Sequence, residues 1–162
     1  EIASWGSAPA PMEGLRLGRG IACGTYKNTS HAAAVADVAV DARGRVRVTR
    51  LWCVHDCGLV INPDQVRAQC EGNLVWSLGM VLTDDLQTDA GHVIAQTFAD
   101  APIPRMTDVP PITVDLIQSN RPPQGAGETA MVAGSGAIAN AIRAATGHRA
   151  VRFPVRPEDF AT

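Results

Sequence analysis

The sequence lacks a long apolar run and contains few aromatic residues. No apolar stretch approaches the roughly 18 residues that a membrane-spanning helix requires. Aromatic residues make up only 4% of the chain, so alanine, valine, isoleucine and leucine must supply most of the core. Hydrophobic residues account for 46% of the sequence and charged residues for 19%, a balance that is typical of a globular domain.

A strong charge of either sign is also missing. The net charge is −2 at pH 7, Lys27 is the lone lysine, and the arginines are scattered along the chain. Recognition of a nucleic-acid backbone or an anionic membrane surface depends on a clustered basic patch. The composition therefore argues against nucleic acid and membrane surfaces as partners.

The 4 cysteines do not form the paired motifs of a structural zinc site or an iron–sulfur cluster. Cys53, His55 and Cys57 share one face of a predicted strand, and Cys70 or His92 would complete a zinc site. Structural zinc sites usually combine two matched cysteine pairs, and the second pair is missing here. Free buried thiols are therefore favoured, and a zinc-stabilised or cofactor-free structural or interaction domain without catalysis is the alternative.

Alternating apolar residues and turn signals predict two β-hairpins. The first has a strand over residues 32–41, a turn at 41–44 and a partner strand that continues to His55. The second is predicted over 83–97, with its turn at 89–91. Both turns contain a glycine, which accepts a positive φ without steric cost.

Three further features complete the predicted organisation. Residues 112–118 have the pattern of another strand. The prolines and glycines of residues 7–19 predict a linker. The chain is therefore expected to divide into a helix end and linker at 1–19 and a subdomain at 20–162.

Two helices are predicted from capping residues and apolar spacing. Asn62 is a suitable N-cap and Pro63 suits the first helical position. Apolar residues at helical spacing follow at Val66, Cys70, Leu74, Leu78 and Val81. The second helix is predicted to begin at Ser135 and to end at Gly147. Because strands and helices do not alternate strictly, the expected fold class is α+β, with mixed hairpins packed against two main helices.

A glycine-rich loop leads to one carboxylate, Glu128. Gly125 and Gly127 precede it and have no Cβ, so they tolerate a positive φ and the close approach of a bulky partner. A carboxylate that is held against such a partner, away from bulk water, has the environment of a general base. On this spacing alone, a solvated loop glutamate is the commoner outcome.

Three sequence blocks, in order and in register, resemble the molybdenum hydroxylases, the family of xanthine dehydrogenase and aldehyde oxidase. The blocks are V-H-D-C-G-L-V-I-N-P-D at 54–64, Q-C-E-G-N-L-V-W-S-L-G-M at 69–80 and G-A-G-E-T-A at 125–130. The stretch from Arg67 to Arg105 is most similar to the branch that contains the beta subunits of isoquinoline 1-oxidoreductase. The resemblance extends from about Trp5 to Pro157.

This resemblance implies roles for individual residues. It implies that Glu128 is the general base and that Gln69 is the glutamine that hydrogen-bonds the pterin. It places Gly125 and Gly127 beside the cofactor. The two residues after the glutamate are Thr-Ala, where the xanthine dehydrogenase branch has a pair of prolines, and this departure concerns substrate geometry rather than reaction type.

The resemblance also implies a larger enzyme, in which this chain is the C-terminal part of the molybdopterin-binding large subunit. The enzyme would hydroxylate an N-heteroaromatic compound, such as an isoquinoline-like ring, or an aldehyde, with oxygen derived from water. Its cofactor would be molybdopterin cytosine dinucleotide with molybdenum. Electrons would leave through a separate small subunit that carries 2Fe–2S clusters, whose cysteine spacings this chain lacks.

The isolated chain is expected to bind no molybdenum or pterin and to be inactive, because Gln69 and Glu128 would form one side of a cleft between large domains. Surfaces that face the missing parts, around 74–82 or 131–138, are expected to be apolar and exposed, which favours self-association. The sequence starts at Glu1 without a signal peptide. For a fragment, this leaves both a cytoplasmic and a periplasmic location open.

Overall fold

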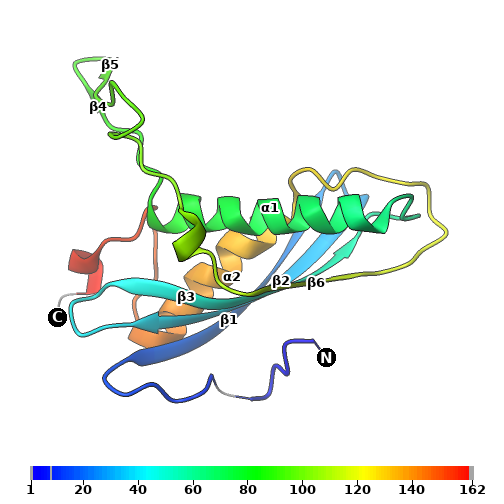
Figure 1. The fold of residues 1–162 in the computed structure, drawn as a ribbon, viewed down its shortest axis with the longest axis horizontal. Coiled ribbons are helices and arrows are strands. Elements are labelled where there is room, and N and C mark those ends of the chain that lie inside the picture. Colours follow the sequence, from blue (N-terminus) through cyan, green and yellow to red (C-terminus); the bar gives the residue numbers. More distant parts are fainter. Residues whose placement is uncertain (1, 8, 161–162) are drawn as a thin grey trace.

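The computed structural model, which describes residues 2–7 and 9–160, has one main sheet and two long helices (Figure 1). The sheet contains β1 (Arg16–Tyr26), β2 (Ser30–Val40), β3 (Val46–Asp56) and β6 (Ile112–Leu116), in the order β1-β2-β3-β6. β1 and β2 are antiparallel, as are β2 and β3, whereas β6 joins β3 in parallel. The helices are α1 (Pro63–Leu82) and α2 (Thr129–Thr146). The predicted α+β class is confirmed.

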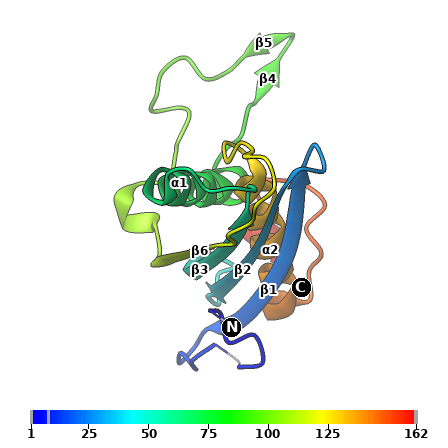
Figure 2. The same cartoon turned by 90° about the vertical axis from the view of Figure 1, so that its right-hand side faces the viewer.

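Both helices cover the same face of the sheet, and the core lies between the two layers (Figure 2). α2 packs mainly on β1 and β2, while α1 lies against α2 and reaches β3 and β6. The large, fully buried side chains are mostly aliphatic, as the low aromatic content predicts. They include Val38, Val40, Leu51, Leu74, Val81, Ile138 and Ile142.

A β-bulge allows β3 to keep one face toward the helices. Asp37 and Val38 of β2 pair with Arg50 and Val48 of β3, so Thr49 has no residue opposite it. One extra residue reverses the alternation of side chains along a strand. The bulge therefore places the apolar residues of both halves of β3 on the helix side.

α1 begins as the sequence predicts. Asn62 is the N-cap, with its side-chain oxygen accepting the N–H of Gln65 at 3.1 Å, and Pro63 occupies the first helical position. The apolar stripe faces the core, with buried residues at Cys70, Leu74, Leu78 and Val81.

α2 begins at Thr129, so the predicted start at Ser135 is wrong. Ser135 is buried within the helix. Gly134 lowers the intrinsic helix propensity of the stretch before Ser135, because glycine weakens a helix. A Cβ at Gly134 would lie 2.5 Å from Oγ of Ser77 on α1, so a glycine is needed here because the two helices pack closely. The predicted end at Gly147 is confirmed by its left-handed φ of 79°.

β1 was not predicted from the sequence. It begins at Arg16, so the expected linker over 7–19 ends earlier and the expected boundary at residue 19 falls inside a strand. Glycines in the strand lower its β propensity. A Cβ at Gly18 would lie 2.1 Å from the carbonyl oxygen of Ala141, and a Cβ at Gly20 would lie 2.2 Å from the nitrogen of the same residue. The glycines are required because the backbone of α2 rests directly on β1.

Residues 2–7 contain turns in place of the expected helix end. Arg19 holds this segment near the outer face of the sheet. Its guanidinium makes two hydrogen bonds with the carboxylate of Asp37, at 2.6 and 2.7 Å, and its Nη1 donates to backbone carbonyls of Ala3, Ser4 and Ser7. The N-terminal segment is therefore tied to the sheet face opposite the helices.

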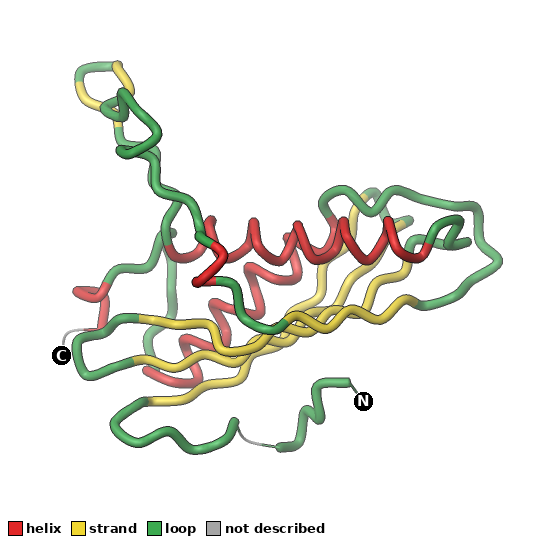
Figure 3. The backbone as a smooth tube through the Cα atoms, in the orientation of Figure 1, coloured by secondary structure: helices red, strands yellow, loops and turns green. Residues whose placement is uncertain are grey.

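The chain between α1 and β6 extends away from the body (Figures 1 and 3). It contains the short pair β4 (Thr88–Asp89) and β5 (His92–Val93), whose turn lies where the sequence predicts but whose strands are shorter than expected. The single-turn 3-10 helices are η1 (Met106–Asp108), before β6, and η2 (Pro157–Phe160), near the C-terminus. No helix in the described ranges has the length and apolar character needed to cross a membrane.

Several of the most exposed apolar side chains lie in this extension. Phe98, Met106 and Leu86 are 99%, 88% and 76% exposed. In segments 74–82 and 131–138, Leu74, Leu78, Val81 and Ile138 are buried, whereas Trp76 and Val132 are 54% and 52% exposed. Trp76 and Val132 are therefore the exposed apolar residues at the two segments where such a surface was expected.

The contact between β1 and α2 generates a stability prediction. Gly20→Ala should destabilise the chain by about 3 kcal/mol or more, because its Cβ would overlap backbone atoms, which cannot move aside as a side chain can. Gly72→Ala is the matched control: a Cβ there meets no described atom within 4 Å, so the helix should gain about 0.5–1 kcal/mol. Urea unfolding of the two variants measures both effects. Equal stability of Gly20→Ala and the parent chain would contradict the close packing.

Candidate functional site

Three strand ends meet at one edge of the sheet. The pairing of β2 with β3 places His31, at the start of β2, opposite Asp56 at the end of β3. The parallel pairing of β3 with β6 places His55 opposite Leu116, so both strands end at this edge. The chain segments that leave β3 and β6 are therefore brought side by side, although they are far apart in sequence.

The turn after β3 and the loop after β6 are joined by backbone hydrogen bonds. The N–H of Leu59 donates to the carbonyl of Arg121 at 2.9 Å, and the N–H of Gln124 donates to the carbonyl of Cys57 at 2.7 Å. Between them, Gly58 has a positive φ of 76°. The first sequence block and the loop that leads into the third block are thus parts of one structural unit.

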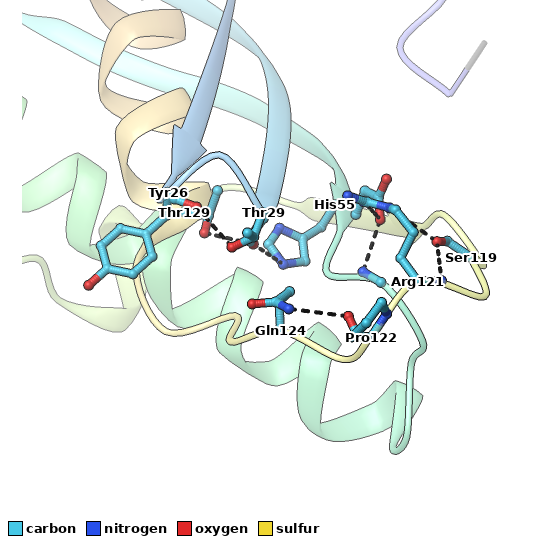
Figure 4. Close-up of polar contacts among 11 residues, drawn as sticks. Tyr26, Thr29, His55, Ser119, Arg121, Pro122, Gln124 and Thr129 are labelled. Carbon is cyan, nitrogen blue, oxygen red and sulfur yellow. Dashed lines mark hydrogen bonds and ion pairs between the residues drawn. The ribbon is translucent and has the colours of Figure 1, made fainter.

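Asp56 stabilises this unit (Figure 4). Its Oδ1 accepts the N–H of Gly58 at 3.0 Å and lies 2.6 Å from Nη2 of Arg121. The Gly58 N–H and, to a smaller extent, the Arg121 guanidinium hold the pKa of Asp56 below its usual range. Asp56 therefore has the turn-stabilising role that its position at the end of a strand suggests, and Arg121 is its partner.

Gln69 is exposed on α1 and lines a hollow of about 260 Å³ between this helix and the glycine-rich loop. Asn62, Gln65, Gln124 and Ala126 line the same hollow. The amide groups on its walls provide both donors and acceptors. A larger hollow, of about 580 Å³, lies near the C-terminal end of α1 and contains none of the predicted site residues.

Gly125 and Gly127 lie in the loop that borders this hollow. Neither has a positive φ, so these positions do not use the left-handed conformation that a glycine tolerates. A Cβ at either glycine would meet no atom of the described residues within 4 Å, so the space beside the loop is open to a partner from outside the chain. Glu128 follows as the N-cap of α2 and is exposed, and its side chain makes no capping hydrogen bond within the described structure.

A group of buried, hydrogen-bonded polar side chains lies at the N-terminal end of α2, next to Glu128 (Figure 4). The sequence had not indicated this group. Oγ of Ser30 lies 3.0 Å from Oγ1 of Thr129 and 3.5 Å from Nε2 of His55. All three residues are buried, and Nδ1 of His55 has no hydrogen-bond partner within residues 2–7 and 9–160. Burial lowers the pKa of His55, with the Asp56 carboxylate acting weakly in the opposite direction. The available sequence signal was the alternation that places His55 on the buried face.

The buried cysteines pack in the apolar core, where Cys53 and Cys70 lie in the same cluster. Hydrogen bonding to Cys70 and burial raise the pKa of Cys53, which keeps that thiol protonated. Cys57 is also buried, whereas Cys23 is exposed, and all the cysteines are free. In the part of the chain that the structure describes, no three His, Cys, Asp or Glu residues form a group that could hold a metal ion. The zinc alternative thus gains no support.

The sequence of residues 15–110 matches the family described as the molybdopterin cofactor-binding domain. The match covers more than half of the chain and includes the whole of α1 with Gln69. The chain therefore belongs to the molybdopterin cofactor-binding domain family. The resemblance to molybdenum hydroxylases is confirmed, although Glu128 lies beyond the matched residues.

Individual relatives extend the similarity to nearly the whole chain. A nicotinate dehydrogenase subunit from Pseudomonas putida is 37% identical over 98% of this chain, which spans 14% of that protein. The beta subunit of isoquinoline 1-oxidoreductase from Brevundimonas diminuta is 32% identical over 97% of this chain, which spans 20% of it. The crystal structure of quinoline 2-oxidoreductase from Pseudomonas putida 86 matches 80% of this chain and 18% of its own, with a TM-score of 0.75 and 29% identity. The chain thus corresponds to a minor part of longer oxidoreductase subunits.

The buried imidazole predicts how stability depends on pH. The pKa of His55 is lower in the folded than in the unfolded chain, where it is about 6.5. The unfolded chain therefore binds more protons below that pH, and stability that is present above pH 6.5 should be lost as the pH falls, by at most about 1.4 kcal/mol per unit.

Unfolding free energies from urea titrations at pH 7.5 and 5.5 test this. His55→Gln should be less sensitive to pH than the parent chain, whereas His92→Gln, in the exposed β4–β5 pair, should keep the parent dependence. An unchanged pH dependence in His55→Gln would show that another group causes it.

Proposed function

We propose that this chain is the part of a molybdenum-dependent oxidoreductase that supplies the general base Glu128 and one wall of the cofactor site. The whole enzyme would hydroxylate an N-heteroaromatic compound or an aldehyde with oxygen derived from water. The observation that carries the proposal is the hollow that α1 shares with the glycine-rich loop, because it joins Gln69 to the segment that ends at Glu128.

The chemistry of this hollow fits a pterin. A pterin edge presents several hydrogen-bond donors and acceptors, and the carboxamide of Gln69 can pair with both kinds. Gly125 and Gly127 leave open space beside the loop, where any larger residue would place a side chain. Gln69, Gly125 and Gly127 are therefore the residues that we propose to contact the cofactor, in its cytosine dinucleotide form. When bound, the molybdenum cofactor supplies the redox chemistry.

Glu128 is suited to moving a proton. Oxidative hydroxylation with water releases protons, so a base is needed near the reacting carbon. The Glu128 carboxylate is exposed beside the loop and is not used to cap α2, so it is free to accept a proton. Gln69 would orient the cofactor at the hollow, while Glu128, at the end of the loop that borders the hollow, takes the proton.

Relatives support the substrate class and the partners. Nicotinate, isoquinoline and quinoline, the compounds after which these relatives are named, are all nitrogen-containing aromatic rings. Other relatives are named for aldehydes, so the proposed substrate is an N-heteroaromatic compound or an aldehyde. The remaining walls of the site would come from the upstream part of the same subunit, and electrons would leave through a separate 2Fe–2S subunit.

Replacing the base gives the first test of this function. In the full-length enzyme, Glu128→Gln should fold and bind cofactor, but kcat should fall by roughly 10²–10⁴-fold, because an amide keeps the shape and cannot take the proton. Glu158→Gln is the matched control, since Glu158 is an exposed glutamate of η2. Steady-state kinetics and molybdenum content are measured for both, and near-normal kcat in Glu128→Gln would remove this residue from the mechanism.

Removal of the proposed pterin contact gives a different signature. Gln69→Ala in the full-length enzyme should lower pterin and molybdenum content, with little effect on folding, because the side chain is exposed on α1. The loss corresponds to about 0.5–1.5 kcal/mol of binding, or more if a cofactor group loses its only partner. Gln87→Ala, in the extension beyond α1, is the control. Equal metal content in all three proteins would make Gln69 an ordinary solvated glutamine.

A further inference from the structure

We infer that Asn73 is the residue that positions Glu128, an inference that rests on the proposed role of Glu128 as general base. Asn73 lies on α1, one helical turn after Gln69, and only 4% of its surface is exposed. Its position within the apolar stripe of the helix distinguishes it from the solvated asparagines of a helix surface.

The carboxamide of Asn73 connects both proposed site residues. Its Nδ2 donates to the carbonyls of Gln69 and Gly127, at 2.6 and 2.9 Å, and its Oδ1 accepts the N–H of Met131 at 3.2 Å. The opposite amide orientation would place donor against donor and acceptor against acceptor, so only this orientation satisfies the contacts. One side chain therefore links the backbone of Gln69 to both flanks of Glu128.

The hydrogen bond from the Met131 N–H to Asn73 affects where the Glu128 carboxylate can lie. The first N–H groups of a helix have no intrahelical partner, and a side chain at the N-cap usually accepts one of them. The Glu128 side chain makes no such bond within the described structure, whereas Asn73 supplies a side-chain acceptor from the neighbouring helix. The Met131 N–H is shared between this acceptor and the backbone carbonyl of Glu128, each at 3.2 Å. Because a helix N-terminus attracts anions, Asn73 reduces the tendency of the Glu128 carboxylate to fold back onto α2.

The bond to Gly127 acts on the other flank. The Nδ2 group of Asn73 donates to the Gly127 carbonyl, and this bond holds the end of the glycine-rich loop against α1. Ser77, one turn further along α1, extends the contact, with its Oγ 3.0 Å from the carbonyl oxygen of Met131. With Asn73 replaced, the loop would lose its anchor to α1 while the rest of the helix contact remained.

Kinetics of the full-length holoenzyme test the inference through a double-mutant cycle. Asn73→Ala should lower kcat by roughly 10- to 100-fold with a smaller change in KM, because a displaced catalytic group loses its alignment. The acidic limb of the kcat–pH profile should move to lower pH, because the carboxylate would then gain helix N–H groups. In a Glu128→Gln background, Asn73→Ala should have no further effect on the residual kcat.

Asn140→Ala is the matched control. The Nδ2 of Asn140 donates to the carbonyl of Ile21 at 2.9 Å, so it also joins a helix to another element, but away from the loop. This variant should keep normal kcat. Equal losses of kcat from Asn73→Ala in the parent and Glu128→Gln backgrounds would mean a general structural role and overturn the inference, with the role of Glu128 intact. Normal kcat in Glu128→Gln would overturn the proposed function itself, and the inference with it.

Two further measurements keep the inference testable if Asn73→Ala does not fold. Asn73→Asp retains the size and the acceptor for the Met131 N–H but lacks the donors, so it should still lower kcat. A crystal structure of the unmodified holoenzyme should show Nδ2 of Asn73 bonded to the Gly127 carbonyl. A Glu128 carboxylate that accepts N–H groups of the first turn of α2 in that structure would refute the inference.

Discussion

The direct packing of α2 on β1 is the constraint on which the rest of this structure depends. A Cβ at Gly18 or Gly20 would overlap backbone atoms of α2, so strand and helix are in backbone contact. Close packing of this kind leaves the helix little freedom to shift. Since Glu128 is the N-cap of α2, the same contact determines where its carboxylate lies relative to the sheet.

The directions of the strands then decide where the site forms. β2 begins at the edge where β3 and β6 end, and this edge collects the turn after β3 and the loop after β6. A hydrogen bond from the N–H of Ile117 to the carbonyl of His55, at 2.9 Å, continues the pairing just past β6. Had β6 joined β3 in the antiparallel direction, the glycine-rich loop would leave from the opposite edge, far from the start of α1.

Buried polar side chains concentrate beside the N-terminus of α2, whereas the rest of the core is mainly aliphatic. Asn73 and Ser77 approach this end of the helix from α1, and Ser30 and His55 lie next to Thr129. Burying a polar group costs free energy unless it is hydrogen-bonded, so such groups are expected where orientation matters more than stability alone. Apolar contacts are not directional and would not hold a carboxylate or a loop carbonyl in one orientation.

Helix caps, turn residues and apolar alternation, which act over a few neighbouring residues, determined several elements from the sequence alone. Asn62 and Pro63 mark the start of α1, Gly147 marks the end of α2, and alternation with a turn identifies β2 and β3. The motif blocks also indicated the family, which the match over residues 15–110 confirmed. Whether Gln69 and Glu128 act as proposed is left to the experiments.

Contacts between residues far apart in the chain decided the other features, namely β1, the start of α2 and the role of Asn73. The glycines of β1 and Gly134 of α2 have poor intrinsic propensities, and only the close neighbour in each case explains why strand and helix form there. Asn73 looked ordinary in sequence because its partners, Gly127 and Met131, lie more than 50 residues away. Spacing along a chain reports which residues share a face, but the partner of a buried polar group is set by how the helices pack, and that depends on the whole core.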